Sequence, residues 1–243
     1  MKAFLAASLA AALLLAAGCG SSSVSTSISR VQLASFSNGN LAAKPSVSSY
    51  SATFNNPVTN GDLIVVAFWW DYALGATISS VTDSVGNSYS PILQTPVGYA
   101  DVSTPAYPAP DWSAWIYAAK NVVGSGNLTV TVTVSYANSD PFSMTILEYS
   151  GVSSLDVTSV NGGTGGTALS SGNATTNHPD ELVLGVAVGE GNIIAASGYN
   201  MLLAPGFCVE EKIVTSAGSY DAEFVMTTDL PDLSWEAGMA TFY

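Results

Sequence analysis

The chain has 243 residues, of which 48% are hydrophobic and only 9% are charged, against about 25% charged residues in a typical soluble domain. Five basic residues face 18 acidic ones, so the formal net charge is −13. This balance argues against nucleic acid as a partner, because nucleic-acid-binding proteins gain affinity from Lys and Arg that neutralise phosphates. It also argues against adsorption to anionic lipid head groups.

The first 18 residues have the pattern of a secretion signal. Lys2 supplies a positive charge, and residues 3–17 form an apolar run of the length typical of a signal-peptide core. The run is shorter than the ~20 residues that a membrane-spanning helix needs. We therefore expect a helical signal peptide over residues 1–18 that is removed from the mature protein.

The segment Leu15-Ala16-Ala17-Gly18-Cys19 resembles the lipobox of bacterial lipoproteins. In that family the cysteine thiol receives a diacylglyceryl group, and the freed amine is often acylated too, with palmitate or a similar chain. The resemblance implies that Cys19 is lipidated and fixes the protein to a membrane. The family prefers Leu three residues before the cysteine, where this chain has Ala16. The alternative is an ordinary secretion signal that leaves Cys19 as a free thiol.

The lipobox resemblance also bears on localisation. Two or three acyl chains on one cysteine anchor a protein stably, whereas a single chain binds only weakly. Gly20 follows the cysteine, and in Gram-negative lipoproteins an Asp at this place tends to retain the protein at the inner membrane. Its absence implies the outer membrane of the bacterial cell envelope.

After the anchor, the chain divides into a short tether and one folded region. Residues 19–29 are rich in Ser and Gly, which predicts a flexible tether. The remaining residues, 30–243, are within the length that a β-sandwich reaches as one domain. Only Cys19 and Cys208 occur, so with Cys19 lipidated we expect no disulfide.

The folded region reads as strand throughout. Residues 128–135 alternate Val with Thr, and residues 49–54 alternate apolar residues with Ser and Thr. Half-buried strands have this pattern. The continuous apolar runs 63–70 and 182–188 indicate central strands covered on both faces, with Trp69 and Trp70 on opposite faces. Further strands are expected at 30–36, 77–82, 88–94, 112–119, 143–150, 169–175, 208–215, 219–227 and 234–242.

Turn sequences recur about every ten residues, which favours a sandwich or barrel. They include Asn60-Gly61, Gly86-Asn87 and Gly162-Gly163. We predict an all-β fold, an antiparallel β-sandwich of jelly-roll type. Two internal echoes pair 62–65 with 181–184 and 49–54 with 219–224. Either two halves of a jelly roll or strand composition alone would produce them.

Four motifs cover residues 81–89, 116–121, 147–151 and 210–220. Together, in this order and spacing, they resemble a β-sandwich module that occurs, often repeated, in secreted and surface proteins of environmental bacteria. The resemblance spans roughly residues 45–243 and implies fold and location but no activity, since no activity or binding residue is assigned to that module. The chain departs from the pattern at 96–111, where a Pro- and Tyr-rich stretch is longer than the usual turn.

A first candidate site is the turn Asp83-Ser84-Val85-Gly86-Asn87. Asp83 and Asn87 supply side-chain oxygens that could contribute to a Ca²⁺ site, although calcium needs 6–8 oxygen ligands. The alternative is that Asp83 accepts hydrogen bonds from the backbone of its own turn.

The second candidate is the Pro-rich stretch 96–111. It concentrates aromatic and acidic side chains, a combination that suits a glycan, because sugar C–H faces stack on rings and hydroxyls donate to carboxylates. The expected ligand-binding residues are Tyr99, Asp101, Tyr107, Asp111 and Trp112. The alternative is that these rings cover an open end of the sandwich.

Catalysis has little support in the sequence. His178 is the only histidine, and no Gly-x-Ser-x-Gly nucleophile elbow occurs. Glu210 and Glu211 begin a strand, where we expect a solvated edge, and Cys208 is expected to be a small buried hydrophobe. We therefore expect no catalytic residues. The sequence also gives no support for a zinc site of the usual kind.

These features predict a lipid-anchored cell-surface module that binds a glycan or a surface protein. One alternative is a structural envelope lipoprotein without a ligand. A second is a glycan-active hydrolase, although the paired carboxylates that such enzymes need have no recognisable motif here.

Overall fold

The structure is a computed structural model that describes residues 27–38, 46–72, 76–96, 111–152, 154–203, 206–228 and 231–243. Within these ranges every regular element is a β-strand and every strand pair is antiparallel. The predicted antiparallel β-sandwich is therefore confirmed. No helix in the described ranges has the length and apolar character needed to cross a membrane. The predicted signal peptide, Cys19 and most of the predicted tether lie outside these ranges.

The described residues in the first half of the chain, which we call unit one, form eight strands. They form a five-stranded sheet in the order β1-β8-β3-β6-β5 and a three-stranded sheet in the order β2-β7-β4. The strands are β1 (Ser29–Ser37), β2 (Val47–Thr53), β3 (Leu63–Tyr72), β4 (Ile78–Asp83), β5 (Ser90–Gln94), β6 (Asp111–Ala119), β7 (Thr129–Asn138) and β8 (Phe142–Ser150).

The second half, unit two, repeats this plan. Its five-stranded sheet has the order β14-β15-β12-β18-β9, and its three-stranded sheet the order β10-β17-β13, with a separate pair β11-β16. The strands are β9 (Leu155–Thr164), β10 (Ala168–Ser170), β11 (Ala174–Thr175), β12 (Glu181–Gly189), β13 (Ile193–Ala195), β14 (Asn200–Leu203), β15 (Phe207–Val214), β16 (Ser219–Tyr220), β17 (Glu223–Met226) and β18 (Ser234–Phe242).

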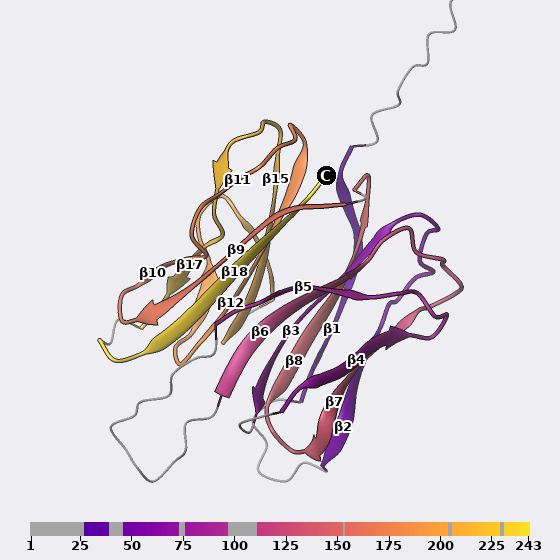
Figure 1. The fold of residues 1–243 in the computed structure, drawn as a ribbon, viewed down its shortest axis with the longest axis horizontal. Coiled ribbons are helices and arrows are strands. Elements are labelled where there is room, and N and C mark those ends of the chain that lie inside the picture. The colour runs from indigo at the N-terminus through magenta and orange to yellow at the C-terminus, as the bar shows by residue number, and fades with distance from the viewer. Residues whose placement is uncertain are drawn as a thin grey trace, which may run out of the picture.

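Each unit has the strand order of a jelly roll. An eight-stranded jelly roll pairs strands 1-8-3-6 in one sheet and 2-7-4-5 in the other. Both units follow this order, except that the fifth strand, β5 or β14, pairs with the sixth at the end of the larger sheet. The region predicted as one domain over 30–243 is thus built from two jelly-roll units, which Figure 1 shows in indigo to rose and in salmon to yellow.

The two units pack against each other through their five-stranded sheets. A central core of side chains from β3, β6 and β8 of unit one meets side chains from β12, β15 and β18 of unit two. Each unit also has its own core between its large and small sheet. The central strands β3 and β12 are therefore covered on both faces, which explains their continuous apolar sequences. Trp70 lies in the core of unit one and Trp69 packs against the central core.

The first internal echo in the sequence matches the structural repeat. Leu63 pairs with Tyr149 and Leu182 pairs with Phe242, so the two leucines occupy equivalent places in their sheets. The second echo does not match, because residues 49–54 fall on β2 whereas 219–224 fall on β16 and β17. That similarity reflects strand composition alone.

Gly162-Gly163 was expected to be a turn, and this prediction is wrong because both glycines lie inside β9. A Cβ at Gly163 would lie 3.1 Å from Cζ2 of Trp235, which packs across the strand from β18. Gly163 thus leaves space for the indole ring of Trp235, and the two glycines do not form a turn. Strand β9 itself was not predicted, since it is a largely exposed edge strand with no strong alternation.

Candidate functional site

A pocket of about 590 Å³ opens where the two units meet, at the end of the central core. We call it the inter-unit pocket. Unit one contributes β3, β5, β6 and the loops that follow β4 and β6, and unit two contributes β9 and β18. Its volume lies within the range of small-molecule sites. The lining residues are Leu63, Gly86, Asn87, Ser88, Ser90, Ile92, Ala118, Lys120, Asn121, Leu155 and Phe242.

The floor of the inter-unit pocket is apolar. Leu63, Ala118 and Phe242 are almost fully buried members of the central core. Ile92 packs against the same core, and Leu155 at the start of β9 remains 39% exposed. Alternate side chains of a strand point to the same face. The core-facing side chains at the ends of β3, β6 and β18 therefore line this opening.

One wall of the pocket is the turn after β4, and Asp83 holds it in shape. Oδ1 of Asp83 accepts hydrogen bonds from the backbone N–H groups of Val85 (3.0 Å), Gly86 (2.7 Å) and Asn87 (3.0 Å). Oδ2 accepts from Nδ2 of Asn87 (2.8 Å) and from the hydroxyl of Tyr89 (3.0 Å). Partial burial raises the pKa of this carboxyl, but the hydrogen bonds outweigh burial and lower the pKa below its ordinary value.

This geometry bears on the predicted calcium ligands. Asp83 and Asn87 do lie side by side, but five donors engage the carboxylate, and Oδ1 of Asn87 accepts from the N–H of Val123 (2.8 Å). The arrangement is the turn that the sequence left open as an alternative. Among the described residues no group of three or more His, Cys, Asp or Glu side chains is placed to hold a metal ion.

Lys120 places a positive charge on the rim of the pocket. Of the other basic residues in the described ranges, Arg30 pairs with Glu211, and Lys212 lies 4.8 Å from the ring centroid of Tyr199. Lys120 is exposed and has no ion pair or ring contact with any described residue. The rim therefore carries an ammonium group that is available to a ligand.

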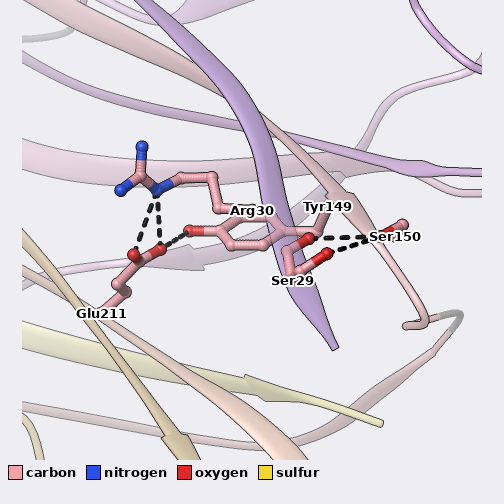
Figure 2. Close-up of polar contacts among 5 residues, drawn as sticks. All are labelled: Ser29, Arg30, Tyr149, Ser150 and Glu211. Carbon is pink, nitrogen blue, oxygen red and sulfur yellow. Dashed lines mark hydrogen bonds and ion pairs between the residues drawn. The ribbon is translucent and has the colours of Figure 1, made fainter. Parts of the chain in front are cut away.

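A polar bridge joins the two units through β1 and β8 of unit one and β15 of unit two (Figure 2). Nε of Arg30 on β1 donates to both carboxylate oxygens of Glu211 on β15, at 3.0 and 3.1 Å. The hydroxyl of Tyr149 on β8 donates to Oε2 of Glu211 at 2.7 Å. Burial, and then the charge of Glu211, raise the pKa of Tyr149 well above its ordinary value. Figure 2 also shows the hydroxyls of Ser29 and Ser150 in contact beside this bridge.

A second polar bridge crosses between the units through Glu236 on β18. The hydroxyl of Thr95 donates to Oε2 of Glu236 at 2.6 Å, and the N–H of Ala114 on β6 donates to the Thr95 hydroxyl at 2.9 Å. Glu236 is 2% exposed. Burial raises the pKa of Glu236 to about 8, although the hydrogen bond from Thr95 opposes the shift.

The glutamates at 210 and 211 were expected on a solvated edge, and this prediction is wrong. Glu210 is 0% and Glu211 is 6% exposed. They point to opposite faces of β15, so Glu211 reaches the cation of Arg30, whereas Glu210 enters the core of unit two. Burial there raises the pKa of Glu210 to about 9. A buried acid is tolerated when its charge is paired or absent. Glu211 is paired with Arg30, and Glu210 is protonated near neutral pH.

The predicted glycan-binding stretch is described only at its end. Tyr99, Asp101 and Tyr107 lie outside the described residues. Asp111 is the first residue of β6, and Trp112 is 6% exposed within the central core. Trp112 is thus packed in the core, as in the alternative that the sequence left open.

Cys208 and His178 have structural surroundings. Cys208 is 0% exposed in the core of unit two, as expected, and burial followed by the charge of Glu210 raises its pKa to about 12. The His178 ring stacks on the ring of the C-terminal Tyr243, with centroids 3.5 Å apart. Neither side chain lines the inter-unit pocket.

Sequence reasoning missed the inter-unit pocket. Its lining comes from five segments that are far apart in the chain, and each segment alone has the composition of an ordinary strand end or turn. The one available indication was Lys120, an isolated cation next to a short turn in an acidic chain. Comparison of the chain with models of protein families, with curated proteins and with solved structures finds no match.

Proposed function

We propose that this protein is a lipid-anchored binding module of the bacterial cell surface that holds a small ligand, most simply a glycan, in the inter-unit pocket. The observation that carries the proposal is the pocket itself, with walls from both units, an apolar floor and a polar rim. Sites of this composition are typical of small-molecule binding, since apolar surface provides affinity and a few polar groups provide orientation.

The rim is suited to a ligand rich in hydroxyl groups. Ser88, Ser90 and Asn121 are exposed and line the pocket, and hydroxyl and amide groups both donate and accept hydrogen bonds. A sugar ring has an apolar C–H face that would rest on Ile92 and Leu155. No carboxylate lines the pocket among the described residues, and hydrolysis of a glycosidic bond needs two. The pocket therefore supports binding better than the hydrolase alternative.

The test of the pocket uses two substitutions on the same strand. Leu155→Trp should fill the inter-unit pocket and abolish ligand binding, because Leu155 lines the pocket and is already 39% exposed. Val160→Trp is the matched control, since Val160 also lies on β9, is 45% exposed and does not line the pocket. Binding would be measured on a glycan array and by calorimetry, with melting temperature as a check on folding.

Two results would contradict the pocket. If both tryptophan variants bound glycan as the wild type does, binding would take place elsewhere on the chain. If no glycan bound to the wild-type protein at all, the structural-lipoprotein alternative would replace the proposal.

The anchor has its own test. If Cys19 is lipidated, Cys19→Ala should block signal processing at that site and remove incorporation of labelled palmitate. The β-sandwich should fold unchanged, because the first strand begins only at Ser29. Mass spectrometry and membrane fractionation would measure the change. Unaltered mass and membrane partition in the variant would overturn the lipoprotein assignment.

A further inference from the structure

The cation on the rim of the inter-unit pocket stands out against the charge of the whole chain. The protein carries 18 acidic and five basic residues, yet no acidic residue lines the pocket in the described ranges and Lys120 does. Elsewhere in the described chain Arg30 and Lys212 are engaged by Glu211 and by the ring of Tyr199. The ammonium of Lys120 is therefore left for a group that none of the described residues supplies.

Three kinds of contact lie within this one pocket. Lys120 offers positive charge, Ser88, Ser90 and Asn121 offer hydroxyl and amide groups, and the floor offers apolar surface. An alkyl carboxylate would use the charge and the floor but would leave the hydroxyl and amide groups without a partner. A neutral sugar would use those groups and the floor but would leave the charge unused.

From this combination we propose that the ligand is an acidic saccharide, a sugar that bears a carboxylate. This inference rests on the proposed function and specifies its ligand. The carboxylate accepts a charge-assisted hydrogen bond from Nζ of Lys120, which is stronger than a bond between neutral groups. The sugar hydroxyls contact Ser88, Ser90 and Asn121, and the C–H face of the ring lies on Leu155.

The experiment compares two probes that share the same sugar rings, one with charged carboxylates and one with these groups neutralised as methyl esters. Digalacturonate and its dimethyl ester would be titrated calorimetrically into the full-length protein held in lipid nanodiscs. We expect digalacturonate to bind at least about tenfold more tightly than the ester, the ratio that one charge-assisted hydrogen bond provides. Its binding should weaken as ionic strength is raised, because Lys120 is exposed to solvent and therefore screened.

Substitutions of Lys120 test whether this side chain causes the preference for the acid over the ester. Lys120→Met keeps the length of the side chain but removes the charge, and should lower the affinity for digalacturonate about tenfold while leaving the ester unaffected. Lys120→Arg should retain most of the preference. Lys212→Met is the matched control, because it removes a cation that lies outside the pocket, over Tyr199.

The outcomes separate this inference from the proposed function. If the acid and the ester bind equally and Leu155→Trp abolishes both, the pocket binds saccharides, but the acidic ligand is overturned. If Lys120→Met retains the preference for the acid, another residue binds the carboxylate and the inference is also overturned. If neither probe binds while neutral glycans still bind in the pocket, only this inference falls. If no saccharide binds, both fall.

Discussion

The free energy of unfolding is expected to fall as the pH is raised from about 5 to about 9, the reverse of the usual behaviour of carboxyl groups. The cause is two buried acids in unit two. Burial raises the pKa of Glu236 to about 8 and that of Glu210 to about 9, from an ordinary value of 4.5. Both acids are therefore protonated in the folded protein over much of this pH range.

The sign follows from the protons bound in each state. Between pH 4.5 and the raised pKa, the unfolded chain has released its proton from each of these acids and the folded chain has kept it. Stability then decreases by about 1.4 kcal/mol per pH unit for each acid. The contribution is fully present below pH 4.5 and is lost once the pH passes about 8 for Glu236 and about 9 for Glu210.

Glutamine variants isolate this effect. Glu236→Gln keeps an acceptor for the Thr95 hydroxyl, but the new side chain cannot ionise. The free energy of unfolding of this variant should therefore fall less steeply with pH than that of the wild type. By about pH 8 the difference from the wild type should have changed by an amount on the order of 4 kcal/mol. Glu210→Gln should show a similar change that extends to about pH 9. Urea unfolding at a series of pH values measures both.

The control for these variants is Asp180→Asn. Asp180 lies just before β12 in unit two, and its side chain is exposed to water, so the substitution should leave the pH profile as in the wild type. Parallel profiles for the wild type and both buried-site variants would show that neither acid is protonated in the fold, and would contradict the prediction.

Removing Glu211 is expected to cause the second large loss of stability. Glu211→Ala leaves the guanidinium of Arg30 and the fully buried hydroxyl of Tyr149 without their acceptor. Breaking a buried ion pair from one side costs about 3–5 kcal/mol. The lower end of that range applies because the Arg30 side chain is 29% exposed. Chemical denaturation of the variant measures the loss.

A double-mutant cycle with Arg30→Ala separates the pair from other effects of the two substitutions. The double variant should be less destabilised than the sum of the single variants, with a coupling energy of about 1–3 kcal/mol. Ser150→Ala is the control, since it removes the neighbouring exposed contact with Ser29 and should change stability by no more than about 0.5 kcal/mol. A coupling energy of zero would mean that Arg30 and Glu211 do not act together across the units.

Local sequence was sufficient to predict the strands with the strongest patterns. The Val–Thr alternation predicted β7, because the side chains of a half-buried strand alternate between core and water. The continuous apolar sequences of β3 and β12 predicted strands covered on both faces, and the two cores on either side of β3 confirm this. Short or exposed strands such as β9 and β13 carry little of this pattern and were not predicted.

The turn at Asp83 was also accessible from sequence. Hydrogen bonds from an aspartate to the next few backbone N–H groups are local, so their pattern depends little on the rest of the fold. The structure has this turn, with bonds from Val85, Gly86 and Asn87. Its place on the wall of a pocket was not accessible, because the opposite wall comes from unit two.

The sequence by itself determined an all-β chain and the approximate positions of its longest strands, since both follow from periods of two residues and from turn chemistry. Only the tertiary structure decided that the chain forms two jelly rolls, that Glu211 faces Arg30, and that Lys120 shares a pocket with Leu155. These depend on contacts between residues that are distant in the chain. Composition limits which contacts are favourable, but the packing of one unit on the other selects among them.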